Sequence, residues 1–202
     1  MKVFNLIVIL GLSMQLYGQS TDSLRNEILV FQKEQNDHYK DKEESPLTKK
    51  ERKHFKGHRF YPINLLYRVT AHFEPFSNPD TVVMPTSAGT EKVYLKYAML
   101  HFNIAEQHCH LVAYQSVKLM QKEEYKDYLF VPFRDNTSGK TSYGGGRYLD
   151  ITIPEGNEVV LNFNLAYNPY CAYTNGWFCS IPPEENTLAV EINAGLMAPE
   201  EH

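Results

Sequence analysis

Residues 65–194 contain a series of short segments in which apolar and polar residues alternate, and no long helical pattern separates these segments. Alternation with a period of two is typical of strands that bury one face. Parallel neighbours need a long crossover, usually a helix, so the missing helices favour antiparallel pairing. We therefore expect a mainly β fold, an antiparallel barrel or sandwich of about eight strands. The candidate strands are YRVTAHFEP, TVVMPTS, KVYLKYAMLHFNI, HCHLVAYQSV, LFVPF, RYLDITI, EVVLNF and TLAVEINA.

Two helices are expected before the first strand. Apolar residues recur at helical spacing within TDSLRNEILVFQKEQNDHYK, residues 21–40, which predicts an amphipathic helix. Thr48 and Glu51 have the spacing of a capping box, in which each residue satisfies a backbone N–H of the other. This box predicts a second, short helix over residues 49–56.

The chain opens with MKVFNLIVILGLSMQLYGQS, in which one lysine precedes an apolar run that ends near small residues. This layout is typical of a secretory signal peptide, and the run is too short for a membrane span. We expect residues 1–18 to be a signal peptide, 19–60 a helical N-terminal arm and 61–202 a β-rich domain that packs with the arm. The expected location is therefore periplasmic or extracellular, without a membrane span.

The charge of the chain is unevenly distributed. The formal net charge is −4, yet Lys and Arg crowd residues 25–59 and none follows Arg147. The basic stretch is interleaved with Asp and Glu, which together with the expected export argues against a nucleic-acid partner. It is expected instead to dock on the acidic body of the protein.

The glycine-rich stretch RDNTSGKTSYGGGRYLD begins at Arg134 and ends at Asp150. Its Asp, Asn, Thr and Ser residues can satisfy local amides, so a hydrogen-bonded turn accounts for much of the pattern. The functional alternative is that residues 144–146 let the backbone approach a ligand. Arg134 or Arg147 then supplies a fixed cation for a carboxylate or phosphate.

Cys171 and Cys179 lie in a segment rich in Pro, Asn and Tyr that also carries the single Trp of the chain. In an exported protein a disulfide between them is the favoured interpretation. Two free structural thiols, a nucleophilic Cys171 and a metal site remain as alternatives. No cofactor is expected.

His108 and His110 flank Cys109 in a candidate strand, so both imidazoles share one face. Two ligands do not complete a metal site, and we expect solvent-facing histidines, with a metal site as the weaker alternative. Cys109 is expected to be a small core residue.

Three blocks of the chain resemble an uncharacterised bacterial family, domain of unknown function 1684. They are PLTKKERKHFKGHRFYPINLLYRV, LFVPFRDNTSGKTSYGGGRYLDI and NFNLAYNPYCAYTNGWFCSIPPEENTLAVEINAG, and the likeness runs from about Ile28 to Gly195. Gly145 stands where this family is expected to carry another small residue, often Ala. The family carries no established reaction, so the resemblance supports the segments and implies no activity. The signature positions that it implies are Asp135, Thr137, Gly139, Tyr143, Gly146, Arg147, Tyr148, Asn164, Tyr167, Asn168, Pro169, Cys171, Cys179, Pro182, Pro183 and Asn186.

The expected function is the binding of a small polar or anionic ligand, sugar-like or acid-like, in a pocket lined by Tyr and Arg. The alternatives are a hydrolase that uses Asp135 and Asp150 or Cys171, and a structural protein of the cell envelope without a small ligand. The expected ligand-binding residues are Arg134, Asp135, Tyr143, Arg147, Tyr148, Asn164, Tyr167, Asn168 and Tyr170, with Trp177 as a further wall.

Overall fold

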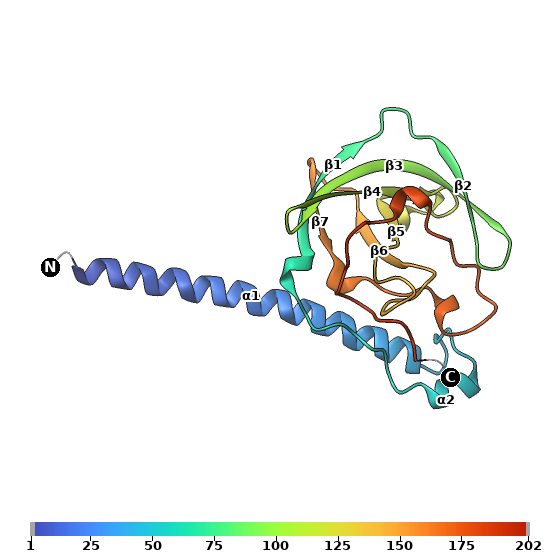
Figure 1. Ribbon diagram of the computed structural model, residues 1–202, viewed down its shortest axis with the longest axis horizontal. Coiled ribbons are helices and arrows are strands. Elements are labelled where there is room, and N and C mark those ends of the chain that lie inside the picture. The colour runs from blue at the N-terminus through green and yellow to red at the C-terminus, as the bar shows by residue number, and fades with distance from the viewer. Residues whose placement is uncertain (1–2, 201–202) are drawn as a thin grey trace.

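The computed structural model describes residues 3–200, with side chains from residue 21 onward. Seven strands form one sheet, in which all paired strands are antiparallel. Their order is β6-β5-β4-β3-β1-β7, with β2 paired to β3. The sheet curls into a nearly closed barrel (Figure 1), which confirms the mainly β, antiparallel prediction. The strands are β1 Arg68–Pro75, β2 Thr81–Pro85, β3 Glu91–Ile104, β4 Gln107–Ser116, β5 Tyr128–Phe133, β6 Arg147–Thr152 and β7 Glu158–Asn162.

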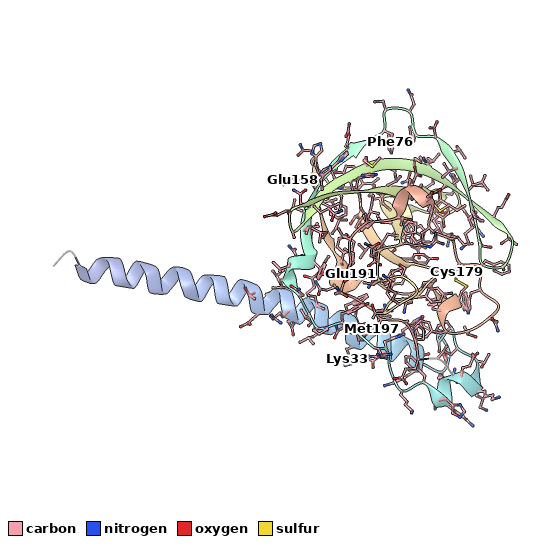
Figure 2. The ribbon with its side chains drawn as sticks, viewed as in Figure 1. Lys33, Phe76, Glu158, Cys179, Glu191 and Met197 are labelled. Carbon is pink, nitrogen blue, oxygen red and sulfur yellow. A yellow bond between two sulfur atoms is a disulfide. The ribbon has the colours of Figure 1, made fainter. Side chains whose placement is uncertain are left out.

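The buried apolar side chains form two groups. Figure 2 draws the side chains around the curled sheet. The barrel core lies inside the curled sheet and includes Phe73, Leu100, Cys109, Leu111, Leu129, Val131, Phe133, Leu149 and Leu161. A second group, here named the outer cluster, consists of Met84, Tyr94, Val112, Tyr114, Phe130 and Tyr148. Cys109 is therefore a core residue, as predicted.

A β-bulge in β3 allows one long strand to serve both groups. The pairing with β4 shifts between Lys96 and Ala98, so that Tyr94 faces Ser116 whereas Ala98 faces Ala113. One extra residue in β3 moves its following side chains to the other face, while the alternation of β4 is unchanged. Tyr94 consequently joins the outer cluster and Ala98 the barrel core.

The eighth candidate strand, TLAVEINA, is not a strand. Its apolar residues Ile192 and Ala194 do enter the barrel core. The carbonyl groups of Ile192, Ala194 and Leu196 accept hydrogen bonds from the Arg147 guanidinium, and the Ile192 N–H donates to Asp135. The alternating apolar residues are therefore buried as predicted. The backbone groups of this segment, however, bond to the side chains of the Arg147–Asp135 ion pair instead of to a neighbouring strand.

Both predicted N-terminal helices are present, α1 Val3–Lys40 and α2 Lys49–His54. The capping box of Thr48 and Glu51 forms as expected. Short 3-10 helices connect the remaining elements: η1 Leu65–Tyr67, η2 Leu119–Gln121, η3 Glu123–Tyr125, η4 Phe163–Leu165, η5 Tyr170–Ala172 and η6 Glu184–Asn186.

The predicted signal peptide, residues 1–18, lies outside the part of the chain whose side chains are described, and it stays a prediction. Among the described residues, no helix is long and apolar enough to cross a membrane.

The helical arm packs on the barrel. Ile28 and Tyr39 of α1 are 0% and 2% exposed, although the helix as a whole lies on the surface. His58, which follows α2, has its ring within 5.0 Å of the rings of Tyr39, Phe55 and Tyr173, measured between centroids. Its Nδ1 lies 2.9 Å from the Tyr173 hydroxyl, so a polar contact anchors an otherwise aromatic junction.

This junction is expected to make stability depend on pH. Desolvation lowers the pKa of His58 to about 4, below the value of about 6.5 in an unfolded chain. As the pH falls from 6.5 to 4 the unfolded state takes up this proton first, so about 2–3 kcal/mol of stability is lost over that window. Urea unfolding at pH 7 and pH 4.5 measures the loss.

Two variants isolate the contribution of His58, because other groups titrate in the same window. The difference in unfolding free energy between pH 7 and pH 4.5 should shrink in His58→Gln and remain unchanged in His108→Gln, whose imidazole is exposed. An equal difference in all three proteins would contradict the assignment.

Candidate functional site

A disulfide closes residues 171–179, within the segment 167–180 that lies over the outer cluster. Cys171 and Cys179 are bonded, which confirms the favoured pairing, and the bond is drawn beside the Cys179 label in Figure 2. The Ser87 N–H, just after β2, donates to the carbonyl of Cys179 at 2.9 Å and ties the segment to the barrel. Cys171 is therefore not available as a thiol nucleophile in this state.

Between this segment and the sheet lies a cavity of about 350 Å³, here named the aromatic pocket. Strands β3, β5 and β6 provide one wall and the disulfide segment the other. Its polar side chains include Lys92 and Asn168. Its aromatic side chains are Tyr94, Tyr128, Phe130, Tyr148, Tyr167, Tyr170, Trp177 and Phe178.

Hydrogen bonds fix the aromatic rings of this pocket. The Tyr148 hydroxyl donates to the carbonyl of Ser180 at 2.5 Å, and the Tyr94 hydroxyl lies 3.0 Å from the hydroxyl of the same serine. The Tyr148 ring meets the rings of Phe130 and Tyr167 nearly at right angles, at centroid distances of 4.7 and 5.7 Å. Burial raises the pKa of Tyr94 and Tyr148, so both stay neutral donors near neutral pH.

Asp150 lies behind two tyrosines of the pocket wall. The hydroxyls of Tyr128 and Tyr167 donate to its carboxylate at 2.7 and 2.9 Å. Asp150 is open to solvent on one side and packed by protein on the others. This desolvation raises the pKa of Asp150, against the two hydrogen bonds, which lower it.

Asn168 lines the aromatic pocket and carries a buried amide oxygen without a partner among the described residues. Its side chain is 2% exposed, and its Nδ2 donates to the Tyr173 hydroxyl at 2.9 Å and to the Met197 carbonyl at 2.8 Å. These two bonds orient the amide and leave Oδ1 without a partner among the described residues. A buried acceptor of this kind is normally satisfied, so a ligand hydroxyl or a water is its expected partner.

Lys92 adds a positive charge to the same pocket. Desolvation, reinforced by the nearby Lys118, lowers its pKa. An anionic ligand group that approaches Lys92 would relieve both effects.

The other expected ligand-binding residues lie elsewhere. Arg147 is 0% exposed and pairs with Asp135 at 3.3 Å, so neither side chain is accessible to a ligand in this conformation. Arg134 donates to the carbonyl of Pro182 at 3.3 Å. Asn164 is likewise structural: its Nδ2 donates to a backbone carbonyl of the segment before β1, at 2.9 Å.

Tyr143 lines a different and larger cavity, of about 880 Å³, between α2 and the glycine-rich loop. The three blocks that carry the family resemblance meet there. Its basic residues Lys50, His54 and Lys140 are exposed, and Glu51 is engaged in the capping box. The expected single site is thus divided between two cavities, with Tyr148, Tyr167, Asn168 and Tyr170 in the aromatic pocket.

His108 and His110 are exposed on the outer face of β4, as expected. The His108 ring stacks on that of His101 at a centroid distance of 5.8 Å. No group of three or more His, Cys, Asp or Glu side chains suited to a metal occurs in the part of the chain that the structure describes.

Several residues of the pocket were not expected from the sequence. Tyr128 and Phe130 alternate within β5 and therefore share one face. This alternation in the sequence could have identified both residues as neighbours on one face of the sheet. Tyr94, by contrast, reaches the pocket only because of the bulge in β3.

Comparisons with known proteins agree with the fold. The solution NMR structure of an uncharacterised protein from Haloarcula marismortui is similar, with a TM-score of 0.69 and 32% identity over 91% of this chain and 99% of that one. No curated protein matches the chain. A family model described as a protein of unknown function, DUF1684, matches residues 53–197. The chain therefore belongs to the DUF1684 family.

Proposed function

We propose that this protein binds a small hydroxylated ligand, sugar-like and with an acidic group, in the aromatic pocket. The observation that carries the proposal is the set of fixed aromatic rings that line the pocket together with Asn168, whose buried Oδ1 has no partner among the described residues. Aromatic faces pack against the C–H faces of a sugar ring, while a few polar groups select its orientation. Rings that are already held by hydrogen bonds lose little conformational entropy on binding.

Each part of the pocket has a role in this proposal. Asn168 accepts a hydrogen bond from a ligand hydroxyl, and Lys92 pairs with a carboxylate. Tyr170 and Trp177, whose ring centroids are 4.7 Å apart, form the wall that the disulfide holds in place.

Trp177 permits a direct test, because it is the single Trp of the chain and is 40% exposed in the pocket wall. Glucuronate should change the tryptophan fluorescence in a saturable way, and glucose should bind more weakly because it cannot pair with Lys92. Replacing Tyr170 by Ala should weaken glucuronate binding about tenfold, since one aromatic wall is lost.

The control is Leu66→Ala, which removes a large exposed side chain outside the pocket and should leave the affinity unchanged. Lys92→Gln should abolish the preference for glucuronate over glucose. Unchanged fluorescence with both sugars at millimolar concentration would contradict the proposal and favour the structural envelope role.

A hydrolase has less support. Asp135 is buried in its ion pair and Cys171 is in a disulfide, which leaves Asp150 as the single accessible member of that expected set. Export from the cytoplasm is part of the same proposal and rests on the pattern of residues 1–18. Mass spectrometry of the protein after expression in a secreting host would show whether this segment is removed.

A further inference from the structure

A separate cavity, lined by both apolar and polar side chains, lies at the seam of the barrel, where β6 and β7 end the sheet without pairing to each other. It measures about 270 Å³, just below the range of about 300–1,000 Å³ that is typical of drug-sized ligands. Glu27 and Phe31 of α1 form its roof. We name this cavity the seam pocket.

Two hydrogen-bond donors without partners point to a ligand there. Arg68 of β1 and Asn162 of β7 are directly opposite each other in the antiparallel pairing, and both line the pocket. Asn162 is 7% exposed, and its Oδ1 accepts from the backbone N–H of Asn164 at 3.3 Å and from the Asn164 Nδ2 at 3.0 Å. These two hydrogen bonds orient the Asn162 amide, so that its Nδ2 points away from Asn164.

Neither the Asn162 Nδ2 nor the buried Nε of Arg68 has a hydrogen-bond partner among the described residues. Buried donors are nearly always paired in folded proteins, and those that are not call for a bound water or ligand. Both side chains line the seam pocket, so we infer that an acceptor atom bound there is the partner of these two buried N–H groups.

Asp150 of β6, across the seam, provides a hydrogen-bond acceptor to the same pocket. Its Oδ1 accepts from both Tyr128 and Tyr167, whereas Oδ2 accepts only from Tyr167 at 3.0 Å, so Oδ2 keeps accepting capacity. The pocket thus presents donors on one side and an acceptor on the other.

The charges of the pocket narrow the ligand class further. A simple anion that approached Arg68 would also face Asp150 and Glu27, and a simple cation would face Arg68. A neutral group with an acceptor oxygen beside a donor hydrogen satisfies all of these side chains, and a secondary amide has that arrangement.

We propose that the seam pocket binds the amide group of a small neutral ligand. Arg68 and Asn162 donate to the amide carbonyl oxygen, and Asp150 accepts from the amide N–H. An acetamido group or an exposed peptide group has this chemistry. The site is independent of the aromatic pocket, because the rings and hydroxyls of Tyr128 and Tyr167 stand between them.

The test is a titration of the ¹⁵N-labelled protein with N-methylacetamide, followed at the side-chain amide resonance of Asn162. A saturable shift is expected. Methyl acetate has nearly the same shape and no N–H, so it should bind about tenfold more weakly, as should sodium acetate. Because the ligand is varied and the protein is not, this comparison does not depend on the folding of any variant.

A variant assigns the donors. Arg68→Met should weaken N-methylacetamide about tenfold, whereas Arg25→Met, on the exposed surface of α1, should have no effect. An unmoved Asn162 resonance, equal binding of acetate or methyl acetate, or equal affinity in the Arg68 variant would each overturn the proposal. Tryptophan fluorescence reports on the aromatic pocket separately, so either proposal can fail alone.

Discussion

Replacement of Arg147 by Met is expected to lower the free energy of unfolding by about 3–5 kcal/mol at pH 7. The guanidinium is fully buried, so its removal leaves the Asp135 carboxylate buried without its countercharge. It also removes the donor that satisfies the carbonyl groups of Ile192, Ala194 and Leu196. Urea unfolding followed by circular dichroism measures the loss.

Two further variants separate the ion pair from general damage to the loop. Arg134→Met removes a nearby arginine whose guanidinium donates to the carbonyl of Pro182, and it should cost about 1 kcal/mol or less. The double variant Arg147→Met with Asp135→Leu should be more stable than Arg147→Met, because no unpaired charge is buried. A loss below 1 kcal/mol in Arg147→Met would contradict the structural role.

Replacement of Asn186 by Ala is expected to cost about 4 kcal/mol, because three buried backbone groups lose their partner. β4 and β5 are joined by a single pair of residues, Tyr114 and Phe130. Beside that pair, the Asn186 amide accepts from the Val112 N–H at 2.8 Å and donates to the carbonyls of Val112 and Pro132 at 2.9 and 2.7 Å. The side chain therefore continues the ladder between the two strands.

Hydrogen exchange provides a local readout of the same variant. The Val112 amide should lose protection in Asn186→Ala, beyond what the global change in stability explains. Asn193→Ala, at an exposed position a few residues later, should change stability by less than about 0.5 kcal/mol. A Val112 amide that stays protected would show that Asn186 does not bridge the strands.

Sequence patterns predicted the helices and strands well where each element depends on residues that are close together in the chain. The capping box of Thr48 and Glu51 is formed within one turn, so its two residues specify it. The alternation in seven segments predicted seven strands, because a half-buried strand needs that period whatever its partner. The disulfide followed from composition and the expected compartment.

What could not be predicted depends on partners far away in the chain. Arg147 bonds to carbonyl groups 45, 47 and 49 residues later, and backbone carbonyls leave no pattern in a sequence. A fixed cation therefore looked like a ligand anchor. The bulge in β3 is set by its register with β4, which one strand alone does not encode.

Only part of the candidate site could be predicted, because its residues come from segments that are far apart in the sequence. Tyr148, Tyr167, Asn168 and Tyr170 do meet in one pocket, since all lie in segments that the disulfide and β6 bring together. Tyr143 was grouped with them by sequence proximity, but the loop turns it toward α2. Arg68 and Asn162 carry no motif, and their proximity arises only from the pairing of β1 with β7.

The hydrogen bonds from Arg147 to residues 192–196 also have a consequence for when the barrel can form during synthesis. A ribosome releases the chain from its N-terminus, so all seven strands emerge before the carbonyls that this guanidinium needs. Burial of the cation without these carbonyls is costly, so until then we expect it to remain in water and the strands around it to stay open. We expect the barrel to close only once residues 192–196 are available, so a nascent chain stalled at residue 190 should remain sensitive to protease.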